Sequence, residues 1–364
     1  MTHRRDVLRA GAGILAAGAL PRAFAAEPQP KTLLVLGGTG FIGPHITDVA
    51  LQRGLKVTHF NRGRRDPDGV PGVETLHGDR KGQLDSLRGR KWDAVVDNTG
   101  YIPKFTKMSA DLLAPNVGFA LFVSSISAYS SFAQANDENS PVGKLTDPEV
   151  EQVTNDTYGP MKAACEQATL QAFDKRSVVI RPGYIVGPKD TNDRFPFWPM
   201  RYSRGGEMLV PGDPADPIQI IDCRDMAAWM MSLVENRTTG VFNAISPVGM
   251  FAMRDLVEGC RRTLPDAGTK VTHVPEEFLA KHWTKEELDV PPWAPMKGAE
   301  PGFSLTSGER AQQTGLKIRP IHESVHDTYE WFRTLPPERQ QNLRAGIKAD
   351  KETDALKKWH EAQG

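Results

Sequence analysis

The sequence predicts an α/β fold in which a doubly wound, Rossmann-type parallel sheet carries a smaller C-terminal part. Apolar residues 33–36 run directly into a glycine-rich turn, and the apolar residues behind the turn recur at helical spacing. Strand-like and helix-like segments then alternate along the chain as far as residue 180. Such an alternation is typical of a parallel sheet with helices on both faces.

The glycine-rich turn fits two spacings, Gly38-x-Gly40-x-x-Gly43 and Gly37-x-x-Gly40-x-x-Gly43. Glycines permit a sharp turn, let the backbone approach a pyrophosphate, and let the helix pack closely on the sheet. The helix N-terminus then offers unpaired N–H groups to phosphates. The turn therefore predicts NAD or NADP binding, and the alternative is a tight turn with no ligand. The cofactor residues predicted in this stretch are Gly37, Gly40, Phe41, Ile42 and Gly43.

The first half of the chain supplies the predicted sheet. Gly54 ends the first helix, and strong helix formers such as Ala163 and Ala164 support the last one. Strands are expected at residues 32–36, 56–60, 73–77, 92–97, 119–123 and 177–180, and helices at residues 41–52 and 158–173.

The second half is less regular. Residues 187–217 are rich in Gly, Pro and aromatic residues and are expected to form loops. Residues 218–221 and 240–243 are expected to be strands that return to the sheet. Further helices are expected at residues 254–263 and 321–332, followed by a charged helical segment.

The N-terminus resembles a bacterial twin-arginine export signal. Arg4-Arg5 precedes a short, weakly apolar run, and Ala23-Phe24-Ala25 fits a cleavage site. The predicted units are the signal peptide at residues 1–25, an NAD(P)-binding domain at 26–186, a mainly substrate-binding part at 187–335, and the charged C-terminal segment at 336–364. The expected location is the periplasm or outside the cell, with no stable membrane insertion after cleavage.

Composition limits the partners. The formal net charge is zero, so we expect no nucleic-acid partner. The three cysteines are far apart and fit neither a metal site nor a disulfide framework. His322-Glu323-Ser324-Val325-His326 matches a zinc-protease pattern, but no third ligand is evident, and no metal is predicted. The oligomeric state stays open, with a homodimer as one option.

The second and third strands end at residues that favour the phosphorylated cofactor. Asn61 stands where an acidic residue usually binds the ribose hydroxyl, and Arg62 follows it. A guanidinium can pair with a 2′-phosphate, so NADP is favoured over NAD, and the alternative is a solvated arginine beside NAD. Asp79 and Arg80 are expected to flank the adenine.

Tyr158 and Lys162 are expected to share one face of a helix. An ammonium group beside a phenol lowers the pKa of the phenol, which would let Tyr158 exchange a proton with a secondary alcohol near neutral pH. Lys162 is also expected to hold the nicotinamide ribose. Ser124-Ser125 ends a strand, where a serine hydroxyl can hold the substrate oxygen. The alternative is a loop whose serine hydroxyls form hydrogen bonds only within the loop itself.

These motifs occur in an order that resembles the extended short-chain dehydrogenases/reductases of the NAD-dependent epimerase/dehydratase family, over roughly residues 31–332. The resemblance implies that Ser125, Tyr158 and Lys162 are catalytic. It further implies that Asn98, Thr99 and Gly100 lie along the cofactor, and that Pro182 and Gly183 lie near the nicotinamide amide. Residues 193–199 and 219–222 resemble a branch related to the plant chloroplast stem-loop-binding proteins.

The expected activity is an NAD(P)-dependent oxidation, reduction or epimerisation at a secondary alcohol or ketone of a carbohydrate-like molecule. Because free cofactor is scarce outside the cytoplasm, we expect the cofactor to be retained. The alternatives are a nucleotide-sugar epimerase or dehydratase and a non-catalytic, RNA-binding-like relative. Predicted substrate contacts are Tyr101, Tyr129, Tyr184, Trp198 and Arg201.

Overall fold

The computed structural model describes residues 29–64 and 69–364. The predicted export signal at residues 1–25 lies outside the described residues. Among the described residues, no helix is both long and apolar enough to cross a lipid bilayer.

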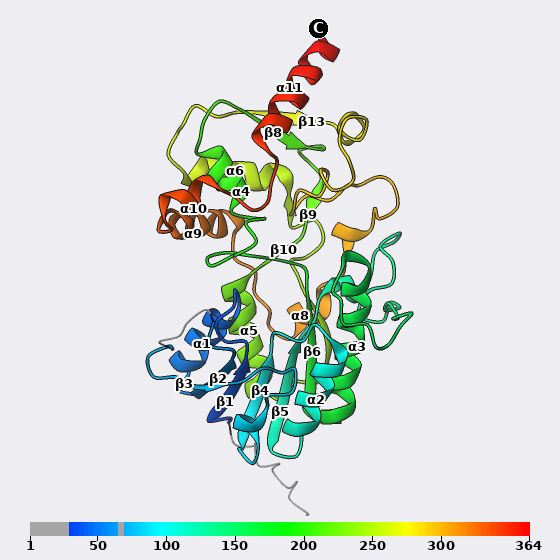
Figure 1. The fold of residues 1–364 in the computed structure, drawn as a ribbon. Coiled ribbons are helices and arrows are strands. Elements are labelled where there is room, and N and C mark those ends of the chain that lie inside the picture. Colours follow the sequence, from blue (N-terminus) through cyan, green and yellow to red (C-terminus); the bar gives the residue numbers. More distant parts are fainter. Residues whose placement is uncertain (1–28, 65–68) are drawn as a thin grey trace, which may run out of the picture.

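A seven-stranded sheet forms the base of the molecule, in the order β11-β6-β5-β4-β1-β2-β3 (Figure 1). All neighbouring strands in it are parallel. Its strands are β1 (Thr32–Leu36), β2 (Lys56–Asn61), β3 (Glu74–His77), β4 (Trp92–Asp97), β5 (Val117–Val123), β6 (Ser177–Pro182) and β11 (Gly240–Ala244). The predicted fold class is confirmed, and each expected strand of the first half lies within three residues of its observed bounds.

Helices cover both faces of the main sheet, and alternate residues of β1 pack against the two helix layers. Leu33 and Val35 pack with residues of α1 (Gly43–Gln52) and α5 (Cys223–Glu235), whereas Leu34 and Leu36 pack with residues of α2 (Pro103–Leu113) and α3 (Asn155–Phe173). Successive side chains of a strand point to opposite faces, so a continuous apolar run is buried on both sides. Helices α2 and α5 have no counterpart among the helices expected from the sequence.

One predicted strand does not join the main sheet. Residues 218–221 were expected to return to it, but they divide into β9 (Pro217–Ile218) and β10 (Ile220–Asp222). β10 pairs with β7 (Tyr184–Val186), and β9 pairs with β12 (Phe251–Ala252). Between them, the Gln219 amide donates to the carbonyls of Ser246 and Thr306, which fixes the change of partner. The prediction for residues 240–243 is confirmed by β11.

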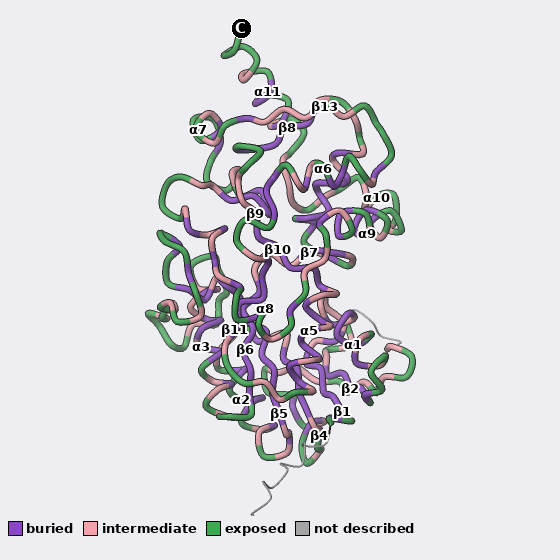
Figure 2. The backbone as a smooth tube through the Cα atoms, turned by 180° about the vertical axis from the view of Figure 1, so that it is seen from behind, coloured by how far each residue is buried: buried purple, intermediate pink, exposed green. Residues whose placement is uncertain are grey.

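The upper part has its own apolar core. It contains β8 (Glu207–Pro211) paired with β13 (Lys270–Val274), and the helices α4 (Phe197–Tyr202), α6 (Met253–Thr263), α7 (Glu276–Leu279) and α9 (Ile321–Arg333). The short α8 (Glu309–Gln313) lies lower, beside the main sheet (Figure 1). Residues 187–217 therefore contain a helix and a strand rather than loops alone. Phe195, Phe197, Trp198 and Tyr202 of this segment are buried in the upper core. Figure 2 colours the backbone by how far each residue is buried.

The charged C-terminal segment is not one continuous helix. It divides into α10 (Pro337–Gln341) and α11 (Ala349–Gln363). The buried Glu352 of α11 accepts a hydrogen bond from the Leu209 amide and pairs with Arg201, and these contacts anchor the helix to β8.

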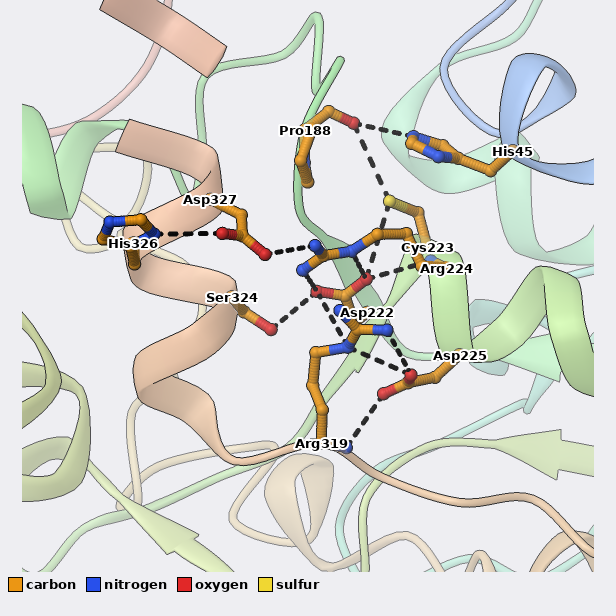
Figure 3. Close-up of polar contacts among 10 residues, drawn as sticks. All are labelled: His45, Pro188, Asp222, Cys223, Arg224, Asp225, Arg319, Ser324, His326 and Asp327. Atoms are coloured by element: carbon orange, nitrogen blue, oxygen red, sulfur yellow. Dashed lines mark hydrogen bonds and ion pairs between the residues drawn. The ribbon is translucent and has the colours of Figure 1, made fainter. Parts of the chain in front are cut away.

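A buried polar network joins the sheet to the upper part (Figure 3). Its centre is Asp222, which caps α5 and accepts hydrogen bonds from Arg224 and from Ser324 of α9. Arg224 also pairs with Asp327 of α9. An unpaired buried carboxylate would be costly, so this arrangement favours one relative position of α5 and α9.

The network extends toward the glycine turn. The Nε2 atom of His45 in α1 lies 2.9 Å from the carbonyl oxygen of Pro188, and the Cys223 thiol donates to the same oxygen (Figure 3). The chain entering the upper part is thereby attached to the helix that begins behind the glycine turn.

Candidate functional site

A cavity of about 1430 Å³ opens along the carboxyl ends of the strands. Residues at or just after the ends of five parallel strands line it, namely Gly37, Asn61, Asn98, Ser125 and Gly183. Ligands of open α/β sheets bind at this edge. We call the walls formed by the glycine turn and the ends of β2 and β3 the cofactor half, and the walls around Tyr158, Tyr184 and the upper loops the substrate half.

The glycine turn has the geometry of a phosphate cradle. Gly37 has a φ of +88°, which favours glycine, and its N–H donates to the Phe60 carbonyl at 3.1 Å. A Cβ atom on Gly43 would clash with the backbone of Gly38, so only glycine allows α1 to begin this close. Gly40, Phe41 and Ile42 line the cavity, whereas Gly43 supports the turn from behind.

The start of α1 is suited to an anion. Ile42 at its N-cap makes no side-chain cap, and its first turn has no acidic residue. Uncapped N–H groups at a helix start favour phosphate. Together with the cradle, this arrangement fits the pyrophosphate of a dinucleotide.

The end of β2 presents cations rather than an acid. Asn61 Oδ1 accepts from the Gly63 amide at 2.7 Å, and its buried Nδ2 atom has no partner among the described residues. The exposed side chains of Arg62 and Arg64 also line the cavity. Among the described residues that end this strand, 61–64, none carries a carboxylate that would repel a 2′-phosphate.

Arg80 belongs to the wall of the cavity, but its guanidinium is already engaged. It donates two hydrogen bonds to Asp97, at 2.8 and 2.7 Å, and one to Ser109. Burial alone would raise the pKa of Asp97, but the charge and hydrogen bonds of Arg80 outweigh burial and lower it. Asp79 also lines this half.

The segment after β4 holds the turn in place. The Asn98 amide donates to the Gly37 carbonyl at 3.2 Å, and the Thr99 hydroxyl donates to the Leu36 carbonyl at 3.4 Å. Asn98 and Thr99 line the cavity, whereas Gly100 does not. Gly183 lines it as well, and Pro182 lies behind it at the end of β6.

Ser125 and Tyr158 both line the substrate half, where the Ser125 hydroxyl donates to Ser127 Oγ at 3.1 Å. Ser125 accepts from the Ser127 amide at 3.1 Å, which orients its hydroxyl. Burial raises the pKa of Tyr158, while a hydrogen bond with Ser125 and the charge of Arg194 oppose that rise. Ser124 does not line the cavity and instead donates to the buried Glu166.

The expected effect of Lys162 on Tyr158 is wrong for this structure. The pKa of Tyr158 is raised, not lowered, and Lys162 is not among the groups that shift it. The Lys162 ammonium is buried behind the cavity wall, where it donates to the carbonyls of Gly100 and Val123 at 2.8 and 2.6 Å. The Tyr101 ring lies 5.1 Å from this ammonium, and burial lowers the pKa of Lys162 to about 8.

Three predicted substrate residues line the cavity, and two do not. Tyr101, Tyr129 and Tyr184 are in its walls. Trp198 is fully buried and donates to the Pro291 carbonyl, because α4 turns its indole into the upper core. Arg201 lies on α4 too, and its guanidinium is occupied by Glu352 and two backbone carbonyls. Both predictions are wrong.

Several residues of the substrate half were not predicted. They come from segments far apart in the sequence and carry no recognisable motif, although Arg194 and Phe195 belong to the aromatic loop already singled out. These residues are Asp156, Asp190, Arg194, Phe195, Asp289, Glu300 and Phe303.

Across residues 29–64 and 69–364, no three His, Cys, Asp or Glu side chains are arranged to hold a metal ion. His326 pairs instead with its neighbour Asp327.

No protein-family model matches the chain. Among curated proteins, it is 24% identical over 275 residues to the chloroplast stem-loop binding protein of 41 kDa b of Arabidopsis thaliana, covering 70% of this chain and 69% of that protein. This agrees with the branch named from the sequence.

The fold is shared with solved structures of two UDP-sugar epimerases and of an enzyme in complex with NAD. The UDP-glucuronic acid 4-epimerase of Bacillus cereus in complex with NAD aligns with a TM-score of 0.58 at 13% identity, over 82% of this chain and 96% of that one. The Bordetella bronchiseptica enzyme WbmG in complex with NAD gives 0.60 at 16% identity, over 87% and 96%. The UDP-glucose 4-epimerase of Thermotoga maritima with UDP-glucose gives 0.58 at 16%, over 83% and 99%.

Proposed function

We propose that this chain is an NAD(P)-dependent oxidoreductase or epimerase acting at a secondary alcohol or ketone of a carbohydrate-like small molecule. One observation supports the proposal most. A single cavity runs from the uncapped glycine turn to the Ser125–Tyr158 pair. A nicotinamide cofactor, when bound, supplies hydride transfer at the substrate carbon.

The residues of the chain divide the remaining work. Gly37 and the start of α1 hold the pyrophosphate, and Gly183 supports the nicotinamide end. Ser125 orients the substrate oxygen, and Tyr158 gives it a proton or takes one from it. With a raised pKa, Tyr158 is a neutral phenol at pH 7 and is ready to protonate a ketone oxygen. In the opposite direction it must first lose its own proton.

The proposed role of Lys162 is that of a positioning residue. Its bonds to the Gly100 and Val123 carbonyls fix the ends of β4 and β5, which carry Asn98 and Ser125. These two bonds use two of the three N–H donors of the ammonium, which leaves one donor for the cofactor ribose.

For the cofactor, we propose NADP over NAD. Arg62 and Arg64 line the cavity beside Asn61, where a 2′-phosphate needs a cation. Binding titrations with both cofactors test this choice.

Two other functions have an observation in their favour. A nucleotide-sugar epimerase is favoured by the UDP-sugar epimerases that share the fold. A non-catalytic RNA-binding relative is favoured by the likeness to the stem-loop binding protein. Against the RNA-binding function stand the zero net charge and the intact Ser125, Tyr158 and Lys162.

We also propose that the protein is exported by the twin-arginine route with its cofactor already bound. The support is Arg4-Arg5 with the short, weakly apolar run behind it. Protein purified from the periplasm, desalted and then denatured should release close to one nicotinamide dinucleotide per chain. Empty protein that needs added cofactor for each turnover would contradict retention.

The activity itself is tested by single-turnover reduction of bound NADP⁺ or NAD⁺, followed as absorbance at 340 nm, with a panel of free and nucleotide-linked sugars. Tyr158→Phe is the matched variant, because it keeps the ring and removes only the hydroxyl group that carries the exchangeable proton. Reduction that is unchanged in the variant would remove Tyr158 from the mechanism.

A further inference from the structure

We propose that the substrate of this cavity is a neutral, polyhydroxylated carbohydrate that carries no nucleoside diphosphate. The inference rests on the proposed function, and it selects the class of substrate from the charges of the substrate half. The UDP-sugar enzymes that share the fold therefore resemble this chain in architecture but differ from it in substrate.

The substrate half is rich in carboxylates. Among the described residues, its walls contain one guanidinium, that of Arg194, and four carboxyl groups, those of Asp156, Asp190, Asp289 and Glu300. A diphosphate would add two further negative charges to this space. Anionic phosphates are instead recognised by clustered arginines and helix starts.

The one guanidinium shares the walls of the substrate half with acids. Asp190 is buried, and the charge of Arg194 reaches it. The charges of Asp289, Arg194 and Glu300 also reach Tyr184 on the same wall. Any favourable pairing of a phosphate with Arg194 is therefore opposed by neighbouring carboxylates.

The other cations of the cavity lie too far away to help. Arg62 follows β2 and Lys81 follows β3, whereas Ser125 follows β5. Three strand positions separate β5 from β2 and four separate it from β3, which is about 14 and 19 Å at the usual strand spacing. Arg80, beside Lys81, is already paired with Asp97.

The donors and acceptors also favour hydroxyl groups. Ionised carboxylates accept hydrogen bonds but do not donate them, and the same is true of phosphate oxygens at neutral pH. Sugar hydroxyls can donate, so they can pair with the carboxylates of this half. Aromatic rings supply flat apolar walls for a sugar ring, since Phe303 lies 4.8 Å from Phe132 and 5.5 Å from Tyr184 between ring centroids.

The test is calorimetric titration of UDP into the full-length protein saturated with NADP⁺. We expect a dissociation constant weaker than about 1 mM, which improves as salt is added because salt screens repulsion. A dissociation constant tighter than about 1 mM that weakens with salt would overturn the inference.

A double variant and its control test whether the charges of the cavity cause the weak binding of UDP. Asp289→Asn with Glu300→Gln should tighten UDP binding at least about tenfold, because two repelling charges are removed. Asp350→Asn with Glu361→Gln removes two exposed charges on α11, outside the cavity, and should leave UDP binding unchanged. No tightening in the cavity variant, or equal tightening in both, would count against the inference.

Hydride transfer distinguishes this inference from the proposed function. If free aldoses reduce the bound cofactor and UDP-glucose does not, both stand. If UDP-glucose reduces it, the proposed function stands and the inference fails. If no sugar reduces it, the proposed function loses its support, and the UDP titration still decides whether the cavity rejects a diphosphate.

Discussion

The two halves of the cavity are built in opposite ways. The cofactor half is formed by consecutive strand ends, by glycines and by cations that line its edge, such as Arg62. The substrate half is formed by loops from distant segments and presents mostly carboxylates, such as Asp289 and Glu300. Under the proposed function, the regular sheet holds the dinucleotide, whereas the irregular segments above it select the substrate.

The largest expected effect is in the substrate half, on proton transfer. Tyr158→Phe should lower single-turnover hydride transfer by about 10²–10⁴-fold, because positioned acid–base catalysis is worth that much. Cofactor affinity should stay the same, since the phenol is remote from the phosphate cradle. Tyr329→Phe, on α9 outside the cavity, is the control and should react like the wild type.

The pH dependence should differ between the two directions of reaction. The pKa of Tyr158 is raised, so the phenolate fraction should rise about tenfold per pH unit between pH 6 and 8. Alcohol oxidation should accelerate accordingly, whereas ketone reduction, which uses the neutral phenol, should change little. Single-turnover rates measured in both directions test this. An oxidation rate that is flat over the same range would show that Tyr158 is already ionised.

In the cofactor half, the largest effect should come from Gly43. Gly43→Ala places a methyl group against the Gly38 backbone, so we expect NADP affinity to fall about 100-fold as the cradle deforms. Gly259→Ala in α6 is the matched control, because a Cβ atom there makes only ordinary contacts, with His322 and Val325 of α9. Fluorescence titration measures both variants. An equal loss of NADP affinity in Gly43→Ala and Gly259→Ala would show that the effect does not come from the glycine turn.

A buried carboxylate of the substrate half, that of Asp190, should lower the free energy of unfolding at neutral pH. The pKa of Asp190 is raised to about 6 by burial, above its usual value of 3.8. The folded state therefore binds the proton more tightly, and the protein loses stability as the pH rises from about 4 to 6. Asp190→Asn should be more stable than the wild type at pH 7 by about 1–3 kcal/mol, with the difference vanishing below pH 4.

Denaturant unfolding at pH 4 and pH 7 measures this difference. In the wild type, the Asp190 carboxylate accepts a hydrogen bond from the Asn192 amide at 2.8 Å. The Asn side chain of the variant retains an oxygen that can accept the same bond. A variant that is less stable at pH 7 would show that this carboxylate stabilises the fold.

The smallest effect concerns cofactor choice. Arg62→Ala should weaken NADP by about tenfold and NAD hardly at all, because only NADP has a phosphate for the guanidinium. Arg88→Ala, which removes an exposed guanidinium paired with Asp85, should change neither. An equal loss of both cofactors in Arg62→Ala would contradict the preference for NADP.

The sheet and most of the cofactor half follow from local patterns in the sequence. Apolar runs such as residues 33–36 must be buried on both faces, and Gly37 and Gly43 meet local backbone demands that the neighbouring residues already set. Ser125, Tyr158 and the turn fall at strand ends or on the adjoining helix, so parallel topology alone brings them to one edge.

Only the tertiary structure decided the substrate half. Trp198 and Arg201 look suited to a ligand in the sequence, but α4 turns them toward the Pro291 carbonyl and Glu352. Lys162 lies at helical spacing from Tyr158, yet its buried ammonium is held by two carbonyls. Asp289 and Glu300 carry no motif, and they reach the cavity because the upper core folds their loops over it. Their role depends on contacts between distant segments, which local sequence patterns do not encode.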